Sequence, residues 1–272
     1  MLETPAGWGL LLVVGVITGV LSGILGIGGG ILMVPVLTLF GVPLVQATAT
    51  SLVGVLLSST SGSIRNFSAG ELNWKNSLLI AVFGMLTAQL GAWLGDRLPD
   101  PILSLAFAVL LVVTIRLIDL KRSLQRKNAA DAEAGVTPEP ETEAANAQTT
   151  PWLSVISIGL LAGFMSGMFG IGGGVVMVPL QMLLLAEPIK AAVRTSLGAI
   201  VPISISGLVQ HTINNNVLWI PGISLGLGGL LGAQFGTRML PKLGDRTVNR
   251  LFRFFLLALA VYMVIRGIRG LT

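Results

Sequence analysis

Long apolar segments, separated by short polar stretches, fill most of the 272-residue chain. A helix that crosses the hydrocarbon core of a bilayer, about 30 Å thick, needs roughly 20 apolar residues. Most segments approach this length, whereas 31–41 and 175–186 would cover only about half of that thickness. The pattern predicts an all-α polytopic membrane protein. The expected segments are 8–25, 31–41, 44–64, 74–95 and 101–118, followed by 152–169, 175–186, 189–210, 217–237 and 247–268.

The two groups of five segments are copies of one repeat. The run G-I-G-G-G at 26–30 recurs 144 residues later at 170–174, and M-V-P at 33–35 recurs at 177–179. Several motifs in the same order at nearly one offset indicate an internal duplication. Further matches, shifted by one residue, pair Thr50-Ser51-Leu52 with Thr195-Ser196-Leu197, Trp74 with Trp219, and Ala88-Gln89-x-Gly91 with Ala233-Gln234-x-Gly236.

The repeat divides the chain into three parts. We expect a first transmembrane repeat at 1–120, a linker at 121–151 and a second transmembrane repeat at 152–272. The linker begins with basic residues and continues with alanine, glutamate, proline, threonine and asparagine. Such a composition buries too little apolar surface to fold, so it predicts a disordered segment.

The lysines and arginines predict how the two repeats are oriented. If all five segments of each half change sides, the linker side holds 14 of the 17 basic residues and the opposite side holds Arg97, Arg266 and Arg269. If 31–41 does not count as a crossing, the split is 9 against 8. Because positive charge collects on the cytoplasmic side, inverted repeats with a cytoplasmic linker and both termini periplasmic are favoured. The 14 are Arg65, Lys75, Arg116, Lys121, Arg122, Arg126, Lys127, Lys190, Arg194, Arg238, Lys242, Arg246, Arg250 and Arg253.

Composition supports a membrane protein and excludes several other classes. Hydrophobic residues make up 53% of the chain and charged residues 11%, against about 25% charged residues in soluble domains. The net charge of +5 does not indicate nucleic-acid binding, because the basic residues lie between apolar segments. With no cysteine and a single histidine, His211, we expect no disulfide, metal ion or cofactor. No nucleophile–base pair has a plausible spacing, so we expect no enzyme.

The glycine runs predict an interrupted helix in each repeat. Each glycine costs about 1 kcal/mol relative to alanine inside a helix, and the short segment that follows places the interruption within the membrane. A half-helix that begins there directs unpaired N–H groups and the positive end of its dipole at a shielded cavity. Inverted repeats would bring two such starts together near the midplane. We therefore expect a small-anion site at Gly28, Gly29, Gly30, Gly172, Gly173 and Gly174.

Polar residues that recur inside the apolar segments are further candidates for binding the anion. Two serines precede the breaks by one helical turn. Other hydroxyls could either bind the anion or bond to their own helices, and two amides could either donate to the anion or link helices. These candidates are Ser22 and Ser166, then Thr50, Ser51, Thr195 and Ser196, then Gln89 and Gln234.

Three residues near segment ends could line a vestibule, or could be ordinary interfacial residues. They are Arg65, Arg194 and His211, of which the last could titrate. Other repeated glycines are expected to be positions of close helix packing rather than binding residues. These are Gly19, Gly23, Gly91, Gly163, Gly167 and Gly236.

The pattern G-x-x-S-G-x-x-G-I-G-G-G-x-x-x-V-P at 19–35 and 163–179 resembles the sulfite exporter TauE/SafE family. The two halves and the A-Q-x-G elements at 88–91 and 233–236 are similar as well. The resemblance implies transport of small sulfur-containing anions, such as sulfite, sulfoacetate or related organosulfonates, across the bacterial cytoplasmic (inner) membrane. The residues alone predict a small anion as the substrate but do not identify which one.

Three functions remain open from the sequence. The first is a secondary carrier that works by alternating access, and the second is an anion channel of the same architecture. The third is a non-transporting membrane scaffold, in which the linker would dock a partner. The expected partners are a small anion and the lipid bilayer but no nucleic acid, and a second copy of the chain in a homodimer is a further candidate.

Overall fold

The computed structural model describes residues 4–133 and 151–270, and these ranges contain helices and short connections without any strand. The structure therefore confirms the all-helical fold class. The helices are α1 (Pro5–Leu25), α2 (Gly30–Leu39), α3 (Leu44–Ser68), α4 (Trp74–Arg97), α5 (Asp100–Glu133), α7 (Pro151–Phe169), α8 (Gly174–Leu184), α9 (Ile189–Ile213), α10 (Trp219–Met239), the 3-10 helix η1 (Leu240–Lys242) and α11 (Asp245–Arg269).

Each expected apolar segment corresponds to one of these helices, with ends that differ by a few residues. The main difference lies in α5, which continues as a helix through 121–133, where we expected the disordered linker to begin. This stretch is polar, but seven of its 13 residues are alanine, lysine or arginine, which have high helix propensity. Low hydrophobicity alone was therefore not sufficient to predict disorder for 121–133. The rest of the expected linker, 134–150, lies outside the described residues.

The outer surface is that of a membrane protein. Seven of the described helices are long and apolar enough to cross a bilayer, and α2 and α8 are shorter apolar helices. All five tryptophans are exposed, at 37% to 59%, and they lie near helix ends. This distribution is typical of aromatic residues at the two membrane–water interfaces. They are Trp8, Trp74, Trp93, Trp152 and Trp219.

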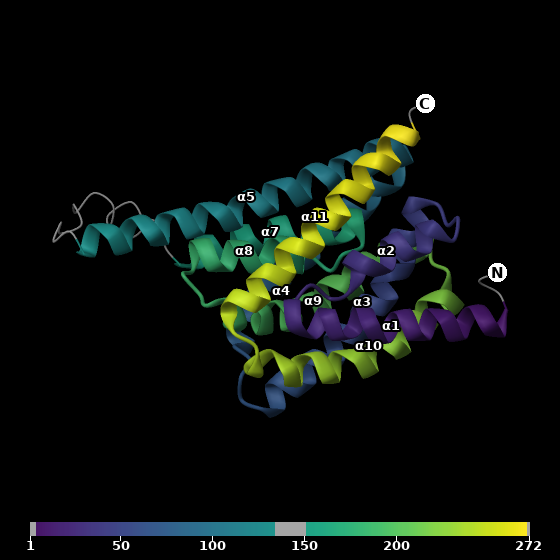
Figure 1. Cartoon of the computed structure of the whole chain (residues 1–272). Coiled ribbons are helices and arrows are strands. Elements are labelled where there is room, and N and C mark those ends of the chain that lie inside the picture. Colours follow the sequence, from purple (N-terminus) through teal and green to yellow (C-terminus); the bar gives the residue numbers. More distant parts are fainter. Residues whose placement is uncertain (1–3, 134–150, 271–272) are drawn as a thin grey trace.

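The two repeats run in opposite directions through the molecule. In Figure 1, the start of α1 and the end of α11 lie at one end, and the end of α5 and the start of α7 lie at the other. We call these the terminal end and the linker end. Helices α1 to α5 alternate in direction, starting from the terminal end, and α7 to α11 alternate starting from the linker end (Figure 1). The inverted five-segment arrangement is therefore present.

Each repeat exchanges its first helix with the other repeat. Helix α1 packs along α10, and α7 packs along α4. Glycines allow this approach: a Cβ atom added to Gly19 would lie 2.8 Å from Cα of Gly229, and one added to Gly167 would lie 2.8 Å from the backbone nitrogen of Ala92. The close-packing interpretation is confirmed for all the glycines concerned, because each has backbone of the facing helix within 3 Å of an added Cβ: Gly19, Gly23, Gly91, Gly163, Gly167 and Gly236.

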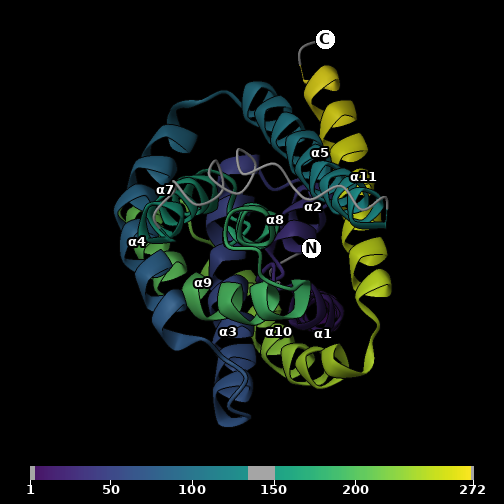
Figure 2. The same cartoon turned by 90° about the vertical axis from the view of Figure 1, so that its left-hand side faces the viewer.

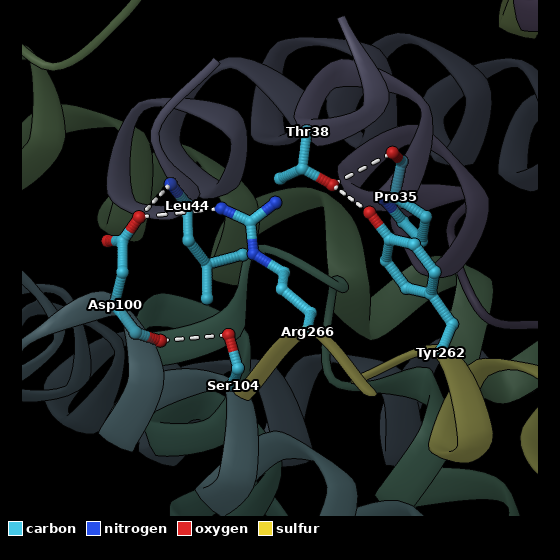
Figure 3. Close-up of polar contacts among 7 residues, drawn as sticks. All are labelled: Pro35, Thr38, Leu44, Asp100, Ser104, Tyr262 and Arg266. Atoms are coloured by element: carbon cyan, nitrogen blue, oxygen red, sulfur yellow. Dashed lines mark hydrogen bonds and ion pairs between the residues drawn. The ribbon is translucent and has the colours of Figure 1, made fainter. Parts of the chain in front are cut away.

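The exchanged pairs surround the interrupted helices. Viewed from the linker end, α2 and α8 lie inside a ring of longer helices, with α5 and α11 paired on one side (Figure 2). Helix α11 holds α2 through a 2.7 Å hydrogen bond between the hydroxyls of Tyr262 and Thr38 (Figure 3). Asp100, at the start of α5, accepts a 3.0 Å hydrogen bond from the backbone nitrogen of Leu44 and pairs with Arg266 at 3.4 Å (Figure 3). These contacts fix the first half-helix and the start of α3 at the terminal end.

Candidate functional site

Both glycine runs interrupt a helix, as the sequence predicts. Helix α1 ends at Leu25 and α2 begins at Gly30, while α7 ends at Phe169 and α8 begins at Gly174. Three glycines in each run have positive φ, from 71° to 83° in the first and from 67° to 79° in the second. Side chains other than glycine rarely adopt this left-handed conformation. The residues are Gly26, Gly28 and Gly29, and Gly170, Gly172 and Gly173. We call 26–30 the first break and 170–174 the second break.

The two breaks touch each other. A Cβ atom added to Gly30 would collide with the carbonyl oxygen of Gly170 and lie 2.8 Å from Cα of Ile171. In the symmetric contact, a Cβ atom on Gly174 would collide with the carbonyl oxygen of Gly26. The breaks therefore cross backbone to backbone, each start of a half-helix lying against the other repeat.

The centre of this crossing is covered by two apolar side chains. Cβ atoms added to Gly28 and Gly172 would lie 2.8 Å and 2.7 Å from Cγ1 of Val55, and 3.3 Å and 3.1 Å from Cγ2 of Ile200. Val55 and Ile200 are fully buried and occupy equivalent positions near the middle of α3 and α9. The breaks thus meet about halfway along two helices that cross the molecule, where the local two-fold relation between the repeats is centred.

The first backbone N–H groups of α2 and α8 are not capped by any side chain. Gly29 and Gly173 occupy the N-cap positions, and no side chain caps either helix. The first amide groups of a helix have no acceptor within the helix, and together with the helix dipole they favour a negative ligand. The carbonyl oxygen of Gly28 is held instead by the Ser58 hydroxyl, at 2.8 Å. Both half-helices therefore begin with backbone N–H groups that no side chain caps.

Four buried serines on the helices that precede or cover the breaks have hydroxyls without hydrogen-bond partners among the described residues. Two of them, Ser22 and Ser166, are candidates from the sequence, and each lies one turn before its break. The other two, Ser59 and Ser204, were not among the sequence candidates. They are 145 residues apart, as are Thr50 and Thr195, so a complete comparison of the repeats would have found them.

The other hydroxyl candidates make structural hydrogen bonds. Ser51 Oγ lies 2.7 Å from the carbonyl oxygen of Thr48 and 2.8 Å from that of Gly170, which ties α3 to the second break. Thr50 accepts a hydrogen bond from the backbone nitrogen of Leu218. Ser51 is thus close to the breaks, although its proton is shared between carbonyl groups.

Their counterparts in the second repeat behave similarly. Ser196 donates to the carbonyl oxygen of Ala192 in its own helix and accepts from Gln181 Nε2 at 3.0 Å. The carbonyl oxygen of Thr195 accepts from the Ser77 hydroxyl at 2.9 Å. The bonds of Ser196 match the alternative in which the hydroxyls stabilise the helices, whereas the bond at Thr195 involves its backbone and not its hydroxyl.

The two glutamines do not lie together at the breaks. Gln89 is exposed on the outer face of α4, whose buried face packs on α7 and α9. Gln234 donates to the Ser61 hydroxyl at 3.0 Å, which links α10 to α3. The observed contact of Gln234 matches the helix-linking alternative.

The three vestibule candidates divide between the two ends. At the linker end, Arg194 pairs with Glu71 at 3.2 Å, and Arg65 lies partly exposed near the end of α3. At the terminal end, His211 is fully buried, and its Nε2 lies 3.0 Å from the carbonyl oxygen of Gly167. Its Nδ1 has no partner within the described part of the chain. The repeat places Asn66 at the equivalent position, also buried and with an amide that lacks partners there.

Comparison with known proteins supports the membrane transport function. The chain is 27% identical over 269 residues to the Probable membrane transporter protein YunE of Bacillus subtilis, covering 95% of this chain and 98% of the relative. A protein of Methanocaldococcus jannaschii that is also named a probable membrane transporter is 32% identical over 221 residues, covering 79% and 76%. No solved structure matches. The chain is thus similar over most of its length to proteins named as membrane transporters.

The match to a protein family covers the two breaks and most of both repeats. The family model described as Sulfite exporter TauE/SafE matches residues 11–263. This range contains all the candidate residues discussed above. The chain therefore belongs to the sulfite exporter TauE/SafE family, and it is a multi-pass membrane transporter.

Proposed function

We propose that the protein is a secondary transporter for a small sulfur-containing anion, sulfite or an organosulfonate such as sulfoacetate, and that it works by alternating access. The contact between the two breaks carries this proposal. Two half-helices of opposite direction begin there, and both present uncapped first turns next to Gly28 and Gly172. Such an arrangement can bind an anion without a lysine or arginine, whose insertion into the membrane is costly.

Burial of the breaks supports alternating access rather than an open pore. Residues 26–30 and 170–174 are all buried, and Val55 and Ile200 cover Gly28 and Gly172. Polar contacts join neighbouring helix ends at both ends of the molecule. Asp96 accepts hydrogen bonds from Asn214 and Asn216 at the terminal end, while Arg194 pairs with Glu71 at the linker end. Opening one set of contacts while the other persists would expose the breaks to one side at a time.

The distribution of basic residues supports one orientation in the membrane. Helix ends at the linker end carry most of the lysines and arginines, whereas Arg97, Arg266 and Arg269 lie at the terminal end. Since cytoplasmic loops carry the excess of positive charge, we place the linker end in the cytoplasm and both termini in the periplasm.

Flux measurements test this proposal. Purified protein in proteoliposomes should take up radiolabelled sulfite with a saturable rate, and preloaded unlabelled sulfite should accelerate the uptake by exchange. Gly29→Leu combined with Gly173→Leu should abolish uptake, because both side chains would enter the breaks. Gly41→Leu is the matched control: Gly41 also has a φ of 83°, but an added Cβ meets nothing within 4 Å.

Two outcomes would contradict the proposal in different ways. Unsaturable flux with large single-molecule currents would identify a channel of the same architecture. Wild-type rates in the Gly29→Leu/Gly173→Leu protein would show that the anion binds elsewhere.

A further inference from the structure

We infer that the crossing of the breaks is a site for a singly charged oxyanion, which the hydroxyls of Ser22, Ser59, Ser166 and Ser204 bind together with the first amides of α2 and α8. This inference rests on the proposed function and narrows its substrate class. It also assigns a binding role to two serines that the sequence did not single out.

The position of the serines supports the assignment. In the first repeat, Ser22 Cβ lies 3.5 Å from a Cβ added to Gly29, and Ser59 Oγ lies 3.2 Å from one added to Gly28. In the second repeat, Ser166 and Ser204 occupy the positions equivalent to Ser22 and Ser59. Ser204 follows one turn after Ile200, which covers Gly172. The two serines beside the first break therefore have equivalents at the matching positions of the second repeat.

Unsatisfied hydroxyls are the observation that points to a ligand. All four side chains are 0% exposed, and their Oγ atoms have no hydrogen-bond partner in the described residues. A buried hydroxyl normally bonds to a carbonyl group of its own helix, as Ser104 and Thr114 do in α5. Leaving a buried polar group without a partner costs about 1–3 kcal/mol. Four such groups in two equivalent pairs are explained if a ligand binds them during transport.

The charge of the site matches one negative charge. A helix N-terminus acts as roughly half a positive elementary charge, so α2 and α8 together contribute about one. None of the lysine or arginine side chains described within 4–119 and 152–270 is buried. The donors at the breaks are therefore neutral groups and helix ends alone.

Such a site discriminates against a second negative charge. The free energy of desolvating an ion rises with the square of its charge, whereas its attraction to fixed dipoles rises only in proportion to the charge. Hydroxyls can also accept a hydrogen bond, so they can bind the proton of a half-protonated oxyanion. Hydrogen sulfite and simple sulfonates fit this site, and doubly charged anions do not. The inference therefore removes sulfoacetate, which carries both a sulfonate and a carboxylate, from the substrates proposed above.

Competition with anions of fixed charge tests the inference. In the sulfite uptake assay, methanesulfonate carries one charge and sulfate carries two at every pH used. Methanesulfonate should inhibit uptake at about tenfold lower concentration than sulfate. Sulfite itself should lose apparent affinity as the pH rises through its second ionisation, whereas the inhibition constant of methanesulfonate should stay constant.

Substitutions test the assigned residues. Ser22→Ala with Ser166→Ala, and separately Ser59→Ala with Ser204→Ala, should weaken inhibition by methanesulfonate about tenfold or more. Ser104→Ala is the control, because this serine is equally buried but bonded within α5. If an alanine variant is not monodisperse after purification, the same positions are tested as cysteine, which keeps the size of the side chain and donates weakly.

The outcomes separate this inference from the proposed function. Equal inhibition by sulfate and methanesulfonate, in a protein that transports sulfite, would overturn the single-charge inference alone. Unchanged inhibition constants in both double variants would overturn the assignment of the serines. Absence of saturable sulfite and sulfonate uptake in the wild-type protein would overturn the proposed function itself, and the inference with it.

Discussion

Backbone conformation limits six positions in the two breaks to glycine, because their φ values lie between 67° and 83°. Gly30 and Gly174 are restricted for a different reason. They begin α2 and α8, and the opposite break leaves no room for a side chain. The crossing of the breaks therefore depends on both left-handed backbone and the missing Cβ atoms.

Substituting Gly30 by alanine should destabilise the protein through steric overlap alone, because Gly30 is not among the glycines with positive φ. The new methyl group would overlap with the carbonyl oxygen of Gly170, and overpacking of this kind costs about 1–3 kcal/mol. Unfolding in mixed micelles by titration with SDS would measure the loss. Gly9→Ala is the control, since Gly9 lies in α1 and an added Cβ meets nothing within 4 Å. It should be neutral or stabilise by up to about 1 kcal/mol. Equal stability of the two variants would contradict the contact between the breaks.

At the scale of elements, the fifth helix of each repeat begins with an aspartate, but the two aspartates have different roles. Asp100 accepts from the start of α3 and pairs with Arg266. Asp245, 145 residues later, pairs with Lys190 at 3.6 Å, with side-chain exposures of 58% and 25%. The two aspartates thus occupy equivalent positions in the repeats but contribute differently to the stability of the protein.

Asp100→Ala should destabilise the protein more than Asp245→Ala does. The first change removes an acceptor at a helix start and an ion pair, at a cost of about 1–2 kcal/mol. The second removes an exposed ion pair, which is worth roughly 0.5 kcal/mol. The same SDS titration measures both free energies. A larger effect of Asp245→Ala would show that the contacts in Figure 3 do not hold the start of α3.

The sequence was sufficient to predict the elements and their breaks, because the length of an apolar run and the density of glycine act locally. It also predicted that Gly19 and Gly163 pack closely, but not against which helices. The exchange of α1 and α7 between repeats depends on contacts between residues more than 70 positions apart. Gln89 shows the same limit: its polarity suggested the interior, whereas the face of α4 that it occupies is set by the packing partners.

For the molecule as a whole, the repeat places Asn66 near the linker end of α3 and His211 near the terminal end of α9. Both side chains are buried, at 1% and 0% exposure, and both have atoms without partners among the described residues. They are matched reporters of opening at opposite ends. Since the chain contains no cysteine, a single introduced thiol can be labelled without background.

Asn66→Cys and His211→Cys should become accessible to a membrane-impermeant thiol reagent in opposite conditions. In a transporter with alternating access, any substrate or gradient that raises the labelling rate of one should lower that of the other. Asn73→Cys and Asn215→Cys lie exposed at the same two ends and should be labelled throughout. Parallel rises at positions 66 and 211 would indicate a continuous pore.

The exchanged first helices make neither half a complete protein. Separated from its partner, a single repeat would leave the glycine-lined faces of its first and fourth helices without the neighbours that cover them. A half-length ancestor would have needed an oppositely inserted copy of itself to fold. The modern chain, divided between Glu133 and Pro151 and produced as two polypeptides, should reassemble into one functional unit, while either fragment alone should be degraded.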